Sequence, residues 1–131
     1  NIATVKPALA TEIDQAALWD GIHDGTIDLL ETDHAPHTRE DKAQGAFGVP
    51  GLETALGLMG VALHHSRITL DTLIKLMHSN PKRIFNIPDQ NSFIEVDFDK
   101  SYTVDSNTFA SKAKWSPFEG WTLYGVILRS K

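Results

Sequence analysis

The run Thr32-Asp33-His34-Ala35-Pro36-His37 directly follows a short and mostly apolar stretch, Ile27 to Leu30. Such a stretch is typical of a strand buried on both sides, and α/β folds collect catalytic and metal-binding groups where those strands end. One carboxylate and two imidazoles are also ligand types that suit zinc. The run therefore favours an α/β fold with a hydrolytic metal site at the end of this strand.

The spacing limits how many of these side chains can meet at one ion. Alternation along a strand sends Asp33 and His34 to opposite sides, and Pro36 keeps the chain out of helix, so that the turn re-aims His37. At most one or two of them could share a metal centre, and a polar turn with hydrogen-bonded histidines is the alternative. For His34 the pattern favours a structural hydrogen bond over a ligand role.

Helical patterns with capping signals occupy much of the chain. Thr11 predicts a helix start because acids follow it in the first turn, and Gly25 predicts the end of that helix. Because the residue before a proline disfavours helix, a helix that opens at Thr69 or Asp71 should end before Pro81. The predicted helices span residues 11–25, 52–65, 69–80 and 81–85.

Strand patterns and one long loop account for most of the rest. Residues 93–98 alternate apolar and acidic side chains, as a strand with one wet face does. The loop 35–51 holds three glycines and two prolines and is long for a simple connection, which predicts a functional segment that is mobile without ligand. The predicted strands span residues 26–32, 93–98, 102–104 and 121–128.

Four further segments match motifs of one known family, in the order in which that family carries them. They are Gly45 to Leu56 (GAFGVPGLETAL), Asn80 to Phe85 (NPKRIF), Tyr102 to Asp105 (YTVD) and Ser111 to Leu123 (SKAKWSPFEGWTL). With these segments the chain resembles the type I dihydroorotases of the amidohydrolase superfamily.

The resemblance implies that the chain is one part of such an enzyme. A complete (β/α)8 barrel takes roughly 250 residues, whereas this chain has 131, and the family's His-x-His pair is not found among its six histidines. The implied fold is α/β, with a C-terminal fragment of a (β/α)8 TIM-like barrel in residues 1–88 and strands of a small β-sandwich extension in 89–131. The missing N-terminal portion, or another chain, should cover the open strand edges.

The same resemblance implies a zinc-dependent cyclic amidohydrolase that interconverts N-carbamoyl-L-aspartate and dihydroorotate in pyrimidine biosynthesis. Asp33 matches a residue that ligates metal and moves the proton between water and the amide nitrogen. His37, Phe47 and Gly48 match residues that contact the substrate, the last two through backbone groups. The alternative is a catalytically inactive dihydroorotase-like piece that acts as a structural or interaction partner, for instance with other pyrimidine-pathway enzymes.

Lys6 marks a departure from the family pattern, which usually has an asparagine at the aligned position. A lysine can pair with a substrate carboxylate as a point charge, but it cannot supply both a donor and an acceptor as an amide does. Lys6 is therefore a further candidate for substrate binding. It also leaves a related cyclic amide or ureide open as the substrate.

Composition narrows the class of protein. The net charge of −5 argues against nucleic acid as a partner, because phosphate contacts need a basic face. No apolar run approaches the ~20 residues of a membrane span, and the first residues lack a signal-peptide pattern. We therefore expect a cytoplasmic protein without membrane contact. Since the chain has no cysteine, a metal site would use histidine and carboxylate ligands.

Overall fold

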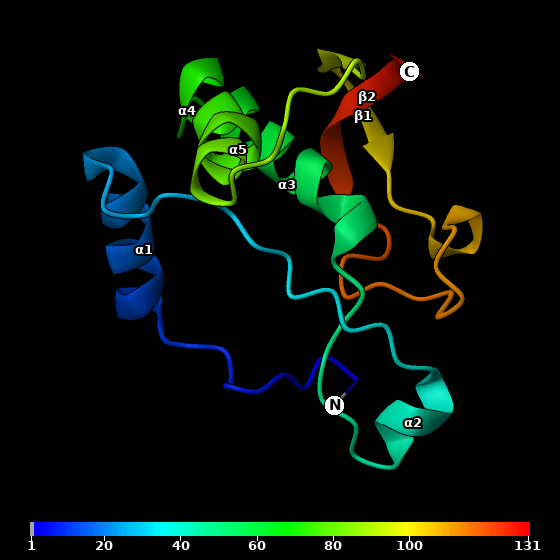
Figure 1. Ribbon diagram of the computed structural model, residues 1–131. Helices are drawn as coiled ribbons and strands as arrows, with labels where there is room; N and C mark the ends of the chain where they lie inside the picture. Colours follow the sequence, from blue (N-terminus) through cyan, green and yellow to red (C-terminus); the bar gives the residue numbers. More distant parts are fainter. Residues whose placement is uncertain (1) are drawn as a thin grey trace.

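The computed structural model describes residues 2–131, which form a small α/β unit. Helix α3 lies between the helices α4 and α5 on one side and a two-stranded sheet on the other, while α1 lies at one edge of the molecule (Figure 1). The elements are α1 (Glu12–Asp24), α2 (Arg39–Ala43), α3 (Leu52–His64), α4 (Leu70–Ile74), η1 (Lys75–Ser79), α5 (Asn80–Ile84), β1 (Ile94–Thr103), η2 (Ser106–Thr108) and β2 (Thr122–Ser130).

Helix α1 begins and ends where the sequence predicts. Thr11 and Asp14 form a capping box, in which each side chain accepts a hydrogen bond from the backbone N–H of the other. Gly25 ends the helix in the left-handed conformation. No residue of α1 is buried, and Ile13 is 82% exposed. The apolar side chain of Ile13 is thus left uncovered by residues 2–131.

The prediction that a helix ends before Pro81 is wrong. Helical backbone continues from α4 through the π-helical turn η1 into α5, and the N–H of Asn80 donates to the carbonyl of Lys75, five residues back. The wider turn shifts the hydrogen-bond register, so that Pro81 falls in the first turn of α5, where no N–H is needed. The predicted short helix from Pro81 is confirmed.

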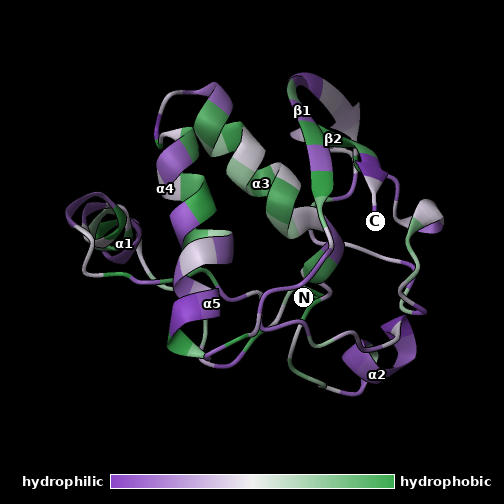
Figure 2. Ribbon diagram, turned by 45° about the horizontal axis from the view of Figure 1, so that its top comes forward, coloured by the Kyte–Doolittle hydropathy of each residue, from purple (hydrophilic) through white to green (hydrophobic). Residues whose placement is uncertain are grey.

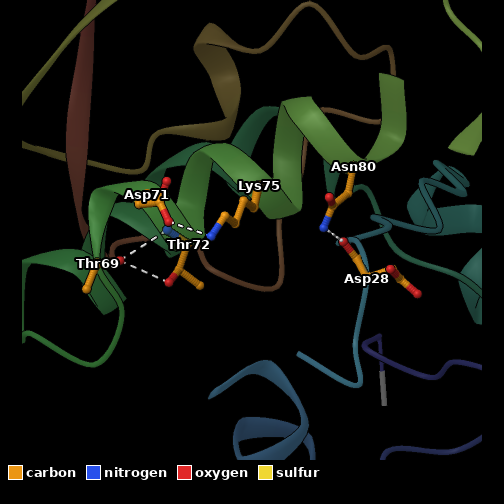
Figure 3. A network of polar contacts seen from close by, with 6 residues as sticks. All are labelled: Asp28, Thr69, Asp71, Thr72, Lys75 and Asn80. Carbon is orange, nitrogen blue, oxygen red and sulfur yellow. Dashed lines mark hydrogen bonds and ion pairs between the residues drawn. The ribbon is translucent and has the colours of Figure 1, made fainter. Parts of the chain in front are cut away.

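The segment 26–32, predicted as a strand, is not one in this structure. The N–H groups of Ile27 and Leu30 donate to the carbonyls of Gly21 and Leu76, and no strand lies beside the segment within residues 2–131. A strand exists only through the ladder of hydrogen bonds to a neighbour. The side chain of Asn80, which donates to the carbonyl of Asp28 over 2.7 Å, further ties this segment to α5 (Figure 3).

The sheet pairs β1 and β2 in antiparallel orientation. Two strands predicted separately, at 93–98 and 102–104, form the single strand β1, with a register shift between Asp97 and Ser101. Strand β2 packs closely on α3 because two glycines of that helix face it. A Cβ added to Gly57 would lie 2.9 Å from the Cβ of Leu123, and a Cβ added to Gly60 would lie 2.1 Å from the carbonyl oxygen of Tyr124.

The hydrophobic core lies between α3 and the helical stretch from α4 through η1. Its buried side chains are Met59, Ala62, Ile68, Leu73 and Leu76. Figure 2 shows the apolar residues of α3 in contrast to α2, which is mostly hydrophilic. No helix in residues 2–131 is both long and apolar enough to span a membrane.

Candidate functional site

Asp33 stands at the surface, at the end of the segment 26–32. It is exposed, its φ is +45°, and its N–H donates to Oε1 of Glu31 over 3.3 Å. A positive φ is uncommon outside glycine, although aspartate and asparagine adopt it more readily than most residues. Residues 2–131 contain no group of three or more histidine, cysteine or acidic side chains that could hold a metal ion. The residues described thus do not by themselves complete a zinc site around Asp33.

His34 has the structural role that the alternation of the sequence favours. Its Nδ1 accepts hydrogen bonds from the N–H groups of Gly51 and Leu52, each over 3.1 Å, at the start of α3. The residue before α3 makes no side-chain cap, so that His34 satisfies helix donors that would otherwise lack an intrahelical partner. The backbone of His34 also forms a parallel bridge with Val49. This bridge joins the Asp-His run to the segment that holds Phe47 and Gly48.

His37 is fixed through its main chain. Its carbonyl accepts a hydrogen bond of 2.7 Å from Nε1 of Trp115, whose side chain is only 1% exposed. The imidazole itself is half-buried. The indole of Trp115, 78 positions along the chain, therefore fixes the backbone of His37. The imidazole ring of His37 takes no part in this bond.

Lys6 and Phe47 lie together at the surface. The Nζ atom of Lys6 is 5.9 Å from the centre of the Phe47 ring, within the range of a cation–π contact. Phe47 is 54% exposed, and its backbone N–H and carbonyl make no hydrogen bond with the described residues. The ammonium group of Lys6, the ring of Phe47 and the unbonded backbone groups of Phe47 thus lie on one surface.

Gly48 is buried and both of its backbone polar groups are engaged. Its N–H donates to the carbonyl of Thr4 over 3.0 Å, and its carbonyl accepts from Nζ of Lys42 over 2.9 Å. With φ at +117°, an added Cβ would lie 2.5 Å from the Cβ of Ala35 and 3.5 Å from Cδ2 of His37. Of the predicted pair, Phe47 has backbone groups free for a substrate in this structure, and Gly48 has none.

Two features of the loop 35–51 were missed from the sequence. The loop contains the helix α2, whose capping box joins Thr38 and Asp41, and it contains the buried side chain of Lys42. The hydrogen bonds from Thr38 lower the pKa of Asp41 below its usual value. A threonine followed three residues later by an acid is a recognisable helix-start signal, and it could have predicted α2.

The fold links four of the five candidate residues, Lys6, His37, Phe47 and Gly48, and no contact joins Asp33 to them within residues 2–131. Lys6 contacts Phe47, and the next residue Gly48 lies beside His37. Asp33 precedes His34, whose backbone is bridged to Val49. The ammonium group of Lys6 beside an exposed aromatic ring can bind a small anionic molecule.

No protein-family model matches the chain. Known proteins nevertheless match it over 95% of its length. The multifunctional protein pyr1-3 of Dictyostelium discoideum is 47% identical over 128 residues, which are 95% of this chain and 6% of that protein. The dihydroorotase of Pyrococcus furiosus is 38% identical over 131 residues, which are 95% of this chain and 31% of that enzyme. The chain is homologous to a segment of dihydroorotase. It spans less than a third of the length of these relatives.

Two solved structures share the fold of this dihydroorotase-like segment. L-hydantoinase (dihydropyrimidinase) from Arthrobacter aurescens matches 98% of the chain with a TM-score of 0.90 and 29% identity, over 32% of its own length. The inactive dihydroorotase-like domain of the CAD-like multifunctional protein of Chaetomium thermophilum matches 93% with a TM-score of 0.75 and 30% identity, over 35% of its length. The chain thus adopts part of the fold of these larger proteins.

Proposed function

We propose that this chain is the C-terminal part of a dihydroorotase that interconverts N-carbamoyl-L-aspartate and dihydroorotate. The homology to proteins named dihydroorotase over 95% of the chain carries this proposal. In the complete protein, residues 1–88 would belong to a (β/α)8 barrel and residues 89–131 to a β-sandwich extension. The remaining barrel strands would pair with the segment 26–32, which finds no strand partner in residues 2–131.

The candidate residues divide into two roles under this proposal. Asp33, which is exposed and carries no hydrogen bond on its carboxylate, would move the proton between water and the amide nitrogen. Lys6, His37 and the backbone of Phe47 would bind the substrate, whose carboxylates suit an ammonium and an imidazole. Zinc, when bound, would supply Lewis-acid chemistry. Asp33 would be the one ligand from this chain, and the others would come from residues outside it.

Substitutions at Asp33 and His37 in the full-length protein test these roles. Asp33→Asn should keep the fold, because asparagine tolerates the positive φ, and should lower kcat by at least ~10³-fold. His37→Ala should weaken substrate binding by about 2 kcal/mol, since a charge-assisted hydrogen bond is lost while the carbonyl bound by Trp115 remains. Steady-state kinetics and zinc content measure both, with the exposed His78→Ala as control. If His37→Ala removed zinc and left KM unchanged, the two roles would be reversed.

A second candidate function is that of an inactive interaction partner. It is favoured by the likeness to the inactive dihydroorotase-like domain of Chaetomium thermophilum. The full-length protein with saturating zinc should turn over dihydroorotate in the first case and not in the second. Hydantoin, tested in parallel because of the likeness to L-hydantoinase, separates a dihydroorotase from a relative with another cyclic amide as substrate.

A further inference from the structure

Lys42 has a buried charge that none of the proposed roles uses. Its side chain is 6% exposed, and no carboxylate within residues 2–131 forms an ion pair with it. An ammonium group loses strong hydration on burial, so that a buried lysine needs hydrogen bonds that replace the water. The neighbouring carboxylate of Asp41 serves the capping box with Thr38 instead.

Three backbone carbonyls replace the water around Lys42. Its Nζ atom donates to the carbonyl oxygens of Thr4 and Ala46, each over 2.7 Å, and to that of Gly48 over 2.9 Å. An ammonium group has three N–H donors, so each of them has one acceptor. The acceptors Ala46 and Gly48 flank Phe47.

The third acceptor extends the effect of Lys42 to the N-terminal segment. Thr4 lies two residues before Lys6, and its carbonyl also accepts the N–H of Gly48. One buried charge therefore joins the backbone on both sides of Phe47 to the segment that carries Lys6. The contact between Lys6 and Phe47 lies directly beyond this junction.

We propose that Lys42 is a positioning residue that holds Phe47 and Lys6 in register for the substrate. Lys42 itself does not contact the substrate, because all three of its N–H groups bind carbonyls of the protein. The inference rests on the proposed function for the role of Phe47 and Lys6. It adds that their placement depends on an internal ammonium group carried by α2.

Kinetics of the full-length protein test the proposal. Lys42→Met keeps the length of the side chain but removes its charge and donors, and it should raise KM for dihydroorotate about tenfold or more with kcat within about threefold. Lys42→Arg should give a KM between those of wild type and Lys42→Met, because the planar guanidinium keeps the charge but matches the three acceptors poorly. Lys112→Met is the matched control at an exposed lysine without a hydrogen-bond partner, and its KM should not change. All assays are run well below each variant's Tm.

Cleavage by an arginine-specific protease gives a second readout, independent of turnover. Arg39 opens α2, and cleavage after it should be faster in Lys42→Met than in wild type and unchanged in Lys112→Met. A Lys42→Met variant that folds with wild-type KM, or one in which kcat alone falls, overturns the proposal. If Lys42→Met does not fold, the KM of Lys42→Arg is the test. A wild-type KM in Lys42→Arg overturns the proposal, and a KM raised by about threefold supports it.

Failure of the proposed function would look different from failure of this inference. A wild-type protein that does not turn over dihydroorotate refutes the function. The protease rate then decides on Lys42, and a rate equal in Lys42→Met and wild type overturns its role.

Discussion

The carbonyl of His37 and both backbone groups of Gly48 bind other parts of the protein. Side-chain substitutions at the site therefore leave its main anchors in place. Lys42 is the exception, since its loss would leave the carbonyls of Ala46 and Gly48 without a donor, while that of Thr4 would keep the N–H of Gly48. Each buried carbonyl left without a donor costs about 1–3 kcal/mol of folding stability, although hydrogen bonds from surface water would offset part of this cost.

Gly48→Ala and Gly45→Ala form a matched pair at the residue scale. Both glycines have positive φ, but an added Cβ meets Ala35 at Gly48 and meets nothing within 4 Å at Gly45. Gly45→Ala should therefore cost about 1–2 kcal/mol for backbone strain alone. Gly48→Ala should cost about 3 kcal/mol or more, because overpacking adds to the strain. Urea unfolding of the full-length variants measures both, and equal losses would contradict the contact with Ala35.

Sequence reasoning was most informative where a residue acts through local geometry. Alternation predicted that His34 makes a structural hydrogen bond, and its Nδ1 does so at the start of α3. The role of Asp33 remains a prediction, since it depends on ligands outside the described residues. Lys42 could not be predicted, because its three acceptors are backbone atoms that only the folded chain brings together.

At the scale of elements, the capping box of α2 gives this helix a pH dependence. The hydrogen bonds from Thr38, side chain first and then backbone, lower the pKa of Asp41 from its usual value of 3.8. A lowered pKa in the folded state means that the stabilisation is complete above 3.8 and is lost as pH falls through the lower folded value. Helix α2 should therefore loosen only in strong acid. Hydrogen exchange of the α2 amides between pH 2.5 and about 5, after correction for intrinsic rates, measures this.

Asp41→Asn is the control for that titration. The amide cannot ionise, so the extra opening of α2 below the usual pKa of Asp41 should disappear. In α1, the hydrogen bonds of Thr11 likewise lower the pKa of Asp14. The opening of α1 in acid should therefore be the same in Asp41→Asn as in wild type. A pH profile of α2 that stays the same in Asp41→Asn would assign the transition to another group.

Elements with local signals were predicted well and elements that need partners were not. The start of α1 follows from its N-cap residue Thr11, and α3 begins at Leu52, where the sequence predicts it. The segment 26–32 has a strand pattern, but residues 2–131 provide no strand beside it. The π-helical turn η1 was missed because a proline normally signals a helix end, and the extra residue in the turn removes that conflict.

At the scale of the whole molecule, apolar side chains remain uncovered. Leu9 is 81% exposed, Ile13 82% and Leu18 57%, all in or just before α1. We predict that the isolated 131-residue chain self-associates, lacks turnover and binds zinc poorly, because open apolar faces associate and Asp33 alone cannot complete a metal site. Analytical ultracentrifugation, calorimetry and zinc titration measure this. A monodisperse 14.5 kDa monomer with a cooperative thermal transition, or one with stoichiometric zinc and turnover, would contradict it.

The indole of Trp115 bonded to the carbonyl of His37 has a counterpart in Glu53, whose carboxylate accepts the N–H groups of Ala110 and Ser111. Both links cross residue 88, where the sequence suggests that one domain ends. The two parts are therefore not interchangeable modules. A chimaera that joined residues 1–88 to the extension of a distant relative would keep the backbone anchor of His37 only if the new extension placed an indole where Trp115 lies.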